Sequence, residues 1–244
     1  MITFGNLAID SEQLTSFLKR EMRVRDLCKQ EIYSRIVTMA AKDKGVTISD
    51  PEIQAEADRF RHQMKLESAK DTIQWLEDQL ITAEEWEEGI HRRLLTQKLA
   101  KHLFEHEVPT YFMQNKLNYE KVILYRIVVR NAPLAQELFY QITEAEISFY
   151  QAAHQYDTSE RRRFHCGYEG TLSRRELTPD MAAQVFGSQP KDVLGPIQSE
   201  EGYDLLMVED FLDAELTEEI QTQILNQLFN EWLNRELIYL MHKD

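Results

Sequence analysis

Cysteine is scarce in this chain, with only 2 in 244 residues. Cys28 and Cys166 lie far apart, so they form neither a disulfide framework nor the close spacing of metal ligands. We therefore expect no metal centre, and no motif of the chain indicates a cofactor. Such sparse use of cysteine is typical of proteins that work in a reducing compartment.

Long apolar runs are missing as well. No stretch of the sequence approaches the roughly 20 apolar residues that a membrane-spanning helix needs. The first residues, MITFGNLAIDSEQL, have neither the basic segment nor the apolar segment of a secretory signal peptide. The sequence therefore predicts no membrane span and a cytoplasmic location.

Positive charge is in short supply, because 28 Lys and Arg stand against 42 Asp and Glu, for a net charge of −14. Binding to phosphate backbones requires clustered Lys and Arg, so we expect no nucleic-acid partner. The content of hydrophobic residues (43%) and charged residues (29%) is ordinary for a globular protein. Polypeptides of basic or neutral character are the partners that this charge favours, and the composition indicates no oligomeric state.

The first 119 residues do contain clear helical periodicity. Apolar residues recur at helical spacing over about 11–44, and Gly45 is placed to end that helix. Residues 49–52 (SDPE) form a capping box with proline at the first helical position, and residues 82–85 (TAEE) form a second box. After Pro109, a further short helix is expected over 111–117.

The residue pattern changes at about Glu120. The segment KVILYRIVV at 121–129 is rich in β-branched residues and predicts a strand. We expect one helix over 133–141 and a second that is opened by a capping box at 143–146 (TEAE). The remaining expected elements are a polar loop over 156–166, a short helix from 178 to about 187, and a buried strand over 202–211.

From about Leu216 to the end, a single helix is predicted. Its apolar residues form a stripe too wide for one neighbour, so the helix must be buried between other elements. The only large helical surface available is that of the first 119 residues. The sequence therefore predicts an α+β protein, with a helical domain of residues 1–119 that is completed by 214–244, and a domain of residues 120–213 inserted between them.

The order of elements and several spaced segments within residues 119–212 resemble the parvulin-type peptidyl-prolyl isomerases, or rotamases. Residues 166–170 (CGYEG) stand where parvulins have a glycine-rich turn. The segment 173–186 (SRRELTPDMAAQVF) is similar to the one that lines their proline pocket, and 194–210 (LGPIQSEEGYDLLMVED) is similar to their closing strand. The resemblance implies a four-stranded antiparallel sheet with helices.

The segment 31–60 (EIYSRIVTMAAKDKGVTISDPEIQAEADRF) resembles the helical chaperone domain of SurA-type and PrsA-type foldases. In those proteins the last helix of the chain also rejoins the helical domain. The resemblance implies apolar clefts that bind extended or unfolded polypeptides. Those relatives are exported, whereas this sequence predicts a cytoplasmic protein.

The resemblance to parvulins assigns a substrate-binding wall to Leu177, Met181 and Phe186, and adds Ser199 from the closing strand. An apolar slot suits this reaction, because the enzyme holds the pyrrolidine ring while the amide twists over a barrier of about 18–20 kcal/mol. The alternative is that these apolar residues are ordinary core residues of a small helix.

The active-site positions of the family carry different residues here. The family has one histidine in its first strand and one in its last, and these positions fall on Arg126 and Asp204. Asp157 is the nearest match to the Cys or Asp that follows the family's second helix. Either Arg126 and Asp204 form an ion pair in place of two histidines, or they are two independent surface charges. If they pair, we expect weak or absent catalysis and retained binding of proline peptides.

Three further patterns have alternative readings. Residues 102–106 (HLFEH) match an inverted zinc-protease motif, but no third ligand is evident, and histidines are common at helix ends. The arginines at 161–163, with Arg174 and Arg175, form either a basic rim that favours acidic residues beside the target proline or a solvated loop. His165 is either a substitute for a missing histidine or an exposed loop residue.

Three functions are consistent with these patterns. The first is a working prolyl isomerase that speeds the folding or maturation of a client. The second is a chaperone or adaptor in which the parvulin-like domain only binds, for example in peptide maturation or secretion. The third is a structural or regulatory protein that uses its helical cleft for one dedicated partner.

Overall fold

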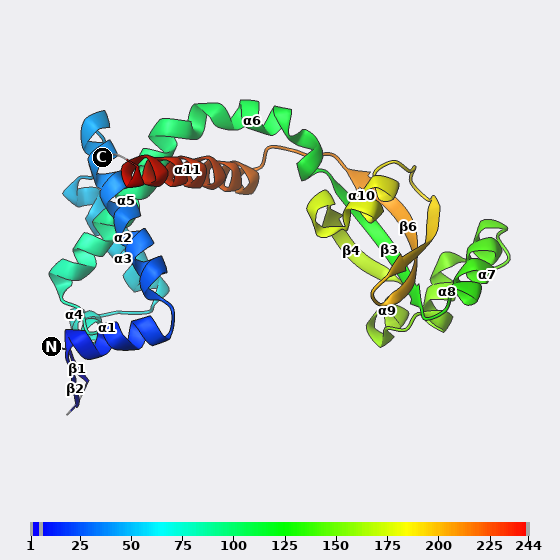
Figure 1. The fold of residues 1–244 in the computed structure, drawn as a ribbon, viewed down its shortest axis with the longest axis horizontal. Coiled ribbons are helices and arrows are strands. Elements are labelled where there is room, and N and C mark those ends of the chain that lie inside the picture. Colours follow the sequence, from blue (N-terminus) through cyan, green and yellow to red (C-terminus); the bar gives the residue numbers. More distant parts are fainter. Residues whose placement is uncertain (1, 5–6, 243–244) are drawn as a thin grey trace. The chain divides into compact units, whose positions relative to one another are not determined.

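The computed structural model describes residues 2–4 and 7–242 of the chain. They divide into two compact units (Figure 1), one formed by Met1–Pro109 with Glu218–Asp244, and the other by Thr110–Thr217. We call them the helical unit and the inserted unit. The predicted class is confirmed, since a sheet-containing unit interrupts the sequence of a helical one. Among the described residues, no helix combines the length and the apolar character needed to cross a membrane.

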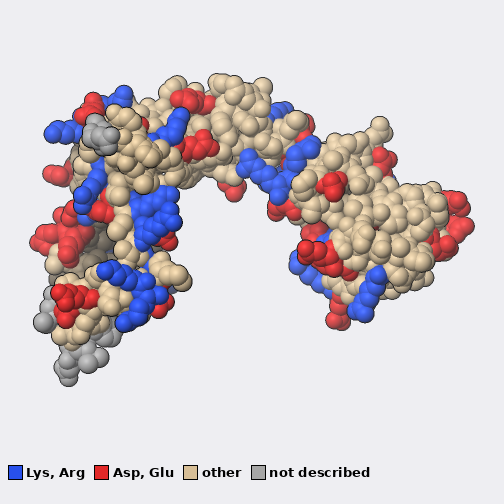
Figure 2. All heavy atoms as spheres, in the orientation of Figure 1, with Lys and Arg blue, Asp and Glu red and all other residues tan. Residues whose placement is uncertain are grey.

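The helical unit begins with a small hairpin and continues as helices. Its elements are β1 (Ile2–Phe4), β2 (Leu7–Ile9), α1 (Ser11–Arg20), α2 (Val24–Lys44), α3 (Asp50–Gln63), α4 (Ala69–Asp78), α5 (Ala83–Phe104), η1 (Glu105–Glu107) and α11 (Glu218–Met241). In Figure 2, acidic and basic side chains are interspersed over this unit, in keeping with ion pairs one helical turn apart such as Arg92–Glu88 at 2.8 Å.

The returning helix α11 packs against α2 and α5, as its wide apolar stripe predicts. Phe229 and Leu233 of α11 are almost fully buried, and Phe229 meets Phe104 of α5 with 6.5 Å between the ring centroids. The shared core of the three helices consists of Ile36, Val37, Ala41, Leu95, Leu99, Ala100, Phe104, Phe229 and Leu233. Burial of such side chains is the main source of stability for a helical domain.

Local signals place most helix ends correctly. Gly45 ends α2 in the left-handed conformation, and the capping boxes at 49–52 and 82–85 open α3 and α5 as expected. The helix predicted over 11–44 is wrong in one respect, because the chain breaks between α1 and α2, where Met22 has a φ of 55°. No glycine or proline marks that break. Helix α4 was not predicted, although Ser68 caps it.

The inserted unit is a four-stranded antiparallel sheet with helices on both faces. Its elements are η2 (Lys116–Tyr119), β3 (Lys121–Val129), α7 (Ala132–Thr143), α8 (Phe149–Tyr156), α9 (Glu160–Phe164), β4 (Tyr168–Ser173), η3 (Arg174–Glu176), α10 (Pro179–Val185), β5 (Val193–Ser199) and β6 (Gly202–Leu212). The strand order is β4-β3-β6-β5, and α6 (Val108–Gln114) spans the boundary between the units.

The two faces of the sheet bury different helices (Figure 1). One face packs against α7 and α8 through Ile127, Val129 and Leu205. The opposite face carries Val122, Leu124, Leu206 and Val208, and packs against Met181 and Val185 of α10. Since side chains alternate along a strand, Arg126 of β3 and Asp204 of β6 belong to the second face. The helix α10 therefore covers the same face that carries both residues.

Two local predictions in this unit are wrong. The box at 143–146 does not open a helix, because α7 ends at Thr143 and Ala145 takes a left-handed φ of 60°. The cap of α8 is Ser148, which forms a capping box with Gln151. The stretch 156–166 is also not all loop, since it contains α9.

Candidate functional site

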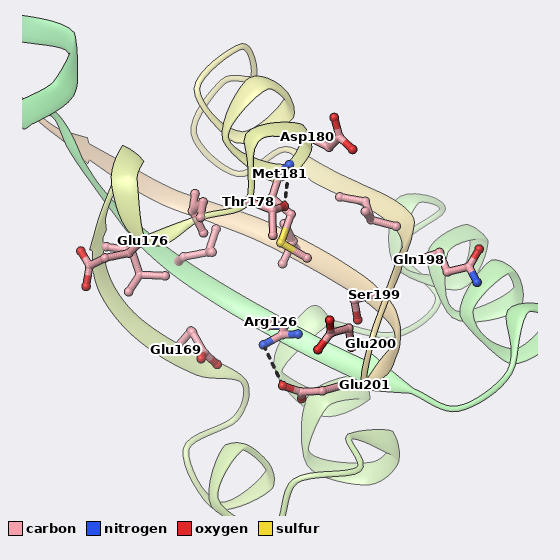
Figure 3. Close-up of a pocket in the computed structure, with 15 residues that line it drawn as sticks. Arg126, Glu169, Glu176, Thr178, Asp180, Met181, Gln198, Ser199, Glu200 and Glu201 are labelled. Carbon is pink, nitrogen blue, oxygen red and sulfur yellow. Dashed lines mark hydrogen bonds and ion pairs between the residues drawn. The ribbon is translucent and has the colours of Figure 1, made fainter. Parts of the chain in front are cut away.

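A cavity of about 570 Å³ lies on the α10 face of the sheet (Figure 3). Strands β3, β4 and β6 form its floor, while the entry to α10 and the end of β5 with the following turn form its walls. It is lined by Leu124, Arg126, Glu169, Leu172, Glu176, Leu177, Thr178, Asp180, Met181, Ile197, Gln198, Ser199, Glu200, Glu201 and Leu206.

The apolar part of this lining includes two of the predicted wall residues. Leu177 and Met181 line the cavity, as does Ser199, whereas Phe186 lies outside the lining. The ring of Phe186 is covered by the guanidinium of Arg174 at 4.3 Å and packs 5.9 Å from the ring of Phe211. The last turn of α10 therefore supports the wall from behind. The predicted spacing of three apolar residues did not distinguish the two sides of this short helix.

Arg126 and Asp204 form the predicted ion pair. Arg126 Nε donates to Asp204 Oδ1 at 2.6 Å, and the Asp204 side chain is completely buried. The two residues are not directly opposite, because Arg126 pairs with Leu206 in the sheet, so the contact is a diagonal one on the same face. The second carboxylate oxygen of Asp204 has no hydrogen-bond partner among the described residues.

Two glycines allow the backbone to pass close to this pair. Gly167 has a φ of 88°, and Arg126 donates its backbone N–H to Gly167 O at 2.7 Å. Gly195 has a φ of 117°, and a Cβ there would lie 2.5 Å from Asp204 O. Both glycines belong to segments that resemble parvulins. Their role here is to let β5 and the start of β4 approach the strands that carry Asp204 and Arg126.

Asp157 is buried at the end of α8 and lies outside the cavity lining. It accepts hydrogen bonds from Val128 N at 3.3 Å, from Ser159 N at 2.7 Å and from Arg162 Nε at 3.0 Å. Burial by itself lowers the pKa of Arg162, but the hydrogen bond and the charge of Asp157 outweigh it and raise that pKa above its ordinary value. Asp157 therefore fastens α9 to the end of β3.

Glu201 connects the two buried ion pairs. It lies 3.8 Å from Arg126 Nη1 and 3.5 Å from Arg162 Nη2, while Arg162 also lies 3.6 Å from Glu169. A network of charges thus runs from Asp157 through Arg162, Glu201 and Arg126 to Asp204. Sequence reasoning missed Arg162 and Glu201 as members, because one lies in a segment expected to be loop and the other lies in the turn after β5.

Of the two alternatives for the arginines at 161–163, 174 and 175, a basic rim is not present at this cavity. Arg161, Arg162, Arg163, Arg174 and Arg175 all lie outside its lining. Arg162 and Arg163 instead bind Asp157, and Arg174 and Arg175 lie over aromatic rings. His165 is exposed and also lies outside the lining. The charged lining of the cavity consists mostly of carboxylates.

The chemistry open to such a site is conformational. Isomerisation of a prolyl bond breaks no bond, so it needs no nucleophile and no metal, only an apolar slot and contacts that favour the twisted amide. Leu177, Met181 and Leu206 supply apolar surface, and the hydroxyls of Thr178 and Ser199 are the neutral side-chain groups that can donate a hydrogen bond to a peptide carbonyl. Arg126 is already engaged by carboxylates.

Comparison with known proteins identifies the inserted unit. Residues 130–210 match the PPIC-type PPIase domain of the rotamase family. The chain is 26% identical over 231 residues to the foldase protein PrsA of Halalkalibacterium halodurans, an alignment that covers 91% of this chain and 68% of that protein. The match to the domain begins after β3, so it includes Asp204 but not Arg126.

Solved structures show the same arrangement of elements. The crystal structure of the peptidylprolyl isomerase PrsA from Bacillus cereus has a TM-score of 0.57 at 16% identity, over 100% of this chain and 92% of that one. PrsA from Bacillus anthracis has a TM-score of 0.51 at 17% identity, over 89% and 99%. The chain therefore has the fold of these PrsA structures, in which a sheet-containing unit interrupts a helical one.

Proposed function

We propose that this protein is a foldase-like chaperone that holds proline-containing segments of polypeptides in the cavity beside α10, with slow or absent prolyl isomerisation. The observation that carries the proposal is the buried Arg126–Asp204 ion pair, at the two positions that the resemblance to parvulins assigns to histidines. The apolar side chains of Leu177 and Met181 line the same cavity, which supports a slot for a proline ring there.

The ion pair argues against efficient turnover for a physical reason. Neutral histidines can donate to or accept from a twisting amide, whereas a guanidinium bound by carboxylates has little freedom to do so. Moving Arg126 toward a substrate would leave Asp204 as an unpaired buried charge, which costs about 3–5 kcal/mol. The contacts of the resting site are therefore expected to persist when a peptide binds.

The helical unit supports a role in holding polypeptide. Its relative PrsA is named a foldase, and several large apolar side chains of the helical unit are exposed. These include Phe17 (50%), Met39 (59%), Ile238 (58%) and Met241 (72%). Exposed apolar side chains on a helical scaffold suit weak contacts with unfolded segments.

A peptide experiment tests the proposal. The full-length protein is titrated with fluorescent peptides that contain one proline, and prolyl isomerisation is followed in parallel by a protease-coupled assay. We expect binding that weakens about tenfold or more in Met181→Ala, and an isomerisation rate close to the uncatalysed one. Phe186→Leu is the matched control on the same helix, because Phe186 lies behind the cavity wall.

The other outcomes discriminate the alternatives. A rate well above the uncatalysed one that is lost in Met181→Ala would identify a working isomerase. Failure to bind any proline peptide, combined with one tight partner in a pull-down, would favour a protein with a dedicated partner. Suppression of client aggregation that is insensitive to Leu177→Ala would assign holding to the helical unit alone.

A cytoplasmic location stays a prediction. It is supported by the two free cysteines, of which Cys28 is exposed and Cys166 is half-buried, because exposed thiols persist best in a reducing compartment. Immunoblotting of separated cell fractions would test it, and recovery of the protein outside the cytoplasm would contradict it.

A further inference from the structure

We infer that the cavity selects proline segments that carry a lysine or arginine directly next to the proline. The inference rests on the proposed function, because it concerns the side chain that flanks a proline held in the same cavity. This preference is the opposite of the preference for acidic residues that a basic rim would give.

The charged lining of the cavity is one-sided. Its carboxylates are Glu169, Glu176, Asp180, Glu200 and Glu201, and its single cation is Arg126. A concave surface with such an excess of one sign focuses its field and attracts the opposite charge. The lining also contains apolar floor residues, so the site is a slot for an uncharged ring that is bordered by negative charge.

The one cation is not free to bind an anion. Arg126 Nε is bound by Asp204 at 2.6 Å, and Arg126 Nη1 lies 3.8 Å from Glu201. Asp204 is fully buried on the same sheet face, and its Oδ2 has no hydrogen-bond partner among the described residues. The charge of Arg126 is therefore already balanced within the protein, and an acidic or phosphorylated peptide would find no unpaired guanidinium in the cavity lining.

Most of the carboxylates have partners within the protein. Glu176 accepts from the backbone N–H and the hydroxyl of Ser173 at 2.7 Å, and these hydrogen bonds lower the pKa of Glu176 below its ordinary value. Glu169 and Glu201 share Arg162. These contacts keep the three side chains in place as fixed negative charges.

Glu200 is the carboxylate best placed for a peptide. It is exposed, and Figure 3 shows it in the turn after β5, directed toward the guanidinium of Arg126, while Asp180, in the first turn of α10, is directed away from Arg126. Glu200 directly follows Ser199, which lines the cavity. A cationic side chain beside a bound proline would therefore meet Glu200 at the mouth of the slot, with Glu201 next to it.

The test compares peptides that differ only beside the proline. Peptides with Lys, norleucine or Glu immediately before the proline, and a second set with the same residues immediately after it, are titrated into the full-length protein at low salt. We expect the Lys peptide of at least one set to bind about 3- to 10-fold more tightly than the norleucine peptide. This is the gain in affinity expected from one half-exposed ion pair. The Glu peptide should bind more weakly than norleucine, and added salt should reduce both differences.

Two variants assign the selection to this side chain. Glu200→Gln should bring the Lys and norleucine affinities to within about twofold, and Glu200→Lys should invert the order of Lys and Glu. Glu146→Gln is the matched control, because Glu146 is an exposed carboxylate between α7 and α8 on the other face of the sheet. It should leave the selection unchanged.

The outcomes separate this inference from the proposed function. Equal affinities for Lys, norleucine and Glu peptides, with binding still lost in Met181→Ala, would overturn the selection while the proline slot stands. Tighter binding of the Glu peptide would overturn it as well. If no peptide binds at any charge, the proposed function itself fails.

Discussion

The two units of this protein are stabilised in different ways. The core of the helical unit is built from apolar side chains of α2, α5 and α11, and its ion pairs lie at the surface, where Arg35–Glu31 and Lys98–Glu52 are typical. In the inserted unit, Asp157 and Asp204 are buried and bound by arginines beside the cavity. The inserted unit therefore differs in that it buries two paired carboxylates in addition to its solvated charges.

The difference indicates which part of the molecule carries a specific site. Solvated ion pairs add little to stability, and apolar packing tolerates many substitutions of similar size. Buried charges are costly unless each is paired, so they persist where the surrounding structure requires them. The network that runs from Asp157 to Asp204 lies at the cavity, which is consistent with a binding function for that region.

The largest effect is expected from breaking the buried pair. Asp204→Asn removes the charge that neutralises Arg126 while the shape of the side chain is preserved. We expect the free energy of unfolding of the inserted unit to fall by about 3–5 kcal/mol. Hydrogen exchange measured along the chain would locate the loss in β3 and β6, with little change in α2, α5 and α11.

The control for that prediction lies on the same strand. Asp210 is exposed on β6, so Asp210→Asn should change stability by less than about 0.5 kcal/mol. The double variant Arg126→Met with Asp204→Leu should recover most of the loss, because it replaces both charges by apolar groups. If Asp204→Asn is no more harmful than Asp210→Asn, the buried pair does not stabilise the sheet.

A smaller effect is expected from truncating the returning helix. Leu233 of α11 is 5% exposed in the core shared with α2 and α5. Leu233→Ala should destabilise the helical unit by about 2–4 kcal/mol through lost burial and a new cavity. Ile238→Ala, at a position 58% exposed on the same helix, should cost less than about 0.5 kcal/mol. Equal effects in a denaturant titration would show that α11 is not fixed by that core.

The smallest effect concerns the solvated charges and depends on pH. Lys98 and Ser49 bind Glu52, with Lys98 as the larger cause, and lower its pKa from 4.5 to about 2. A carboxylate with a depressed pKa adds stability above its unfolded pKa, and this stability is lost as the pH falls through the folded pKa. Glu52→Gln should therefore lower the melting temperature by about 1–3 °C at pH 6, and the difference from wild type should shrink between pH 4.5 and pH 2.

The exposed Glu87 of α5 provides the comparison for that series. Glu87→Gln should leave the melting temperature within about 1 °C of wild type, both at pH 6 and between pH 4.5 and pH 2. A constant difference between Glu52→Gln and wild type across the acid range would contradict a charge effect and would point to altered capping of α3.

Helix ends were predictable where the signal is local. Ser49 and Thr82 form hydrogen bonds with residues three positions later, so the four residues of each box contain the whole interaction. Residues 143–146 fit the same capping-box pattern but open no helix, because α7 continues through Thr143 and the chain then turns at Ala145. The break at Met22 had no local signal at all.

The candidate site was predictable only in part. The resemblance to parvulins supplied the positions of Arg126, Asp204, Leu177 and Met181. Because side chains alternate along a strand, an Arg126–Asp204 pair was a reasonable expectation. Arg162 and Glu201 were missed because their contacts join α9 to the turn after β5, which are far apart in the sequence. The carboxylates that line the cavity were not predicted for the same reason, because they come from segments far apart in the sequence.

By itself, the sequence determined the division into a helical part and a sheet-containing part and the caps of α3 and α5, because these depend on contacts between neighbouring residues or on the period of apolar side chains. Only the tertiary structure decided that Phe186 lies outside the cavity lining, that Arg162 and Arg163 bind Asp157, and that carboxylates line the cavity. Those outcomes depend on which distant segments meet, and Coulomb interactions act on distance in space and not on distance along the chain.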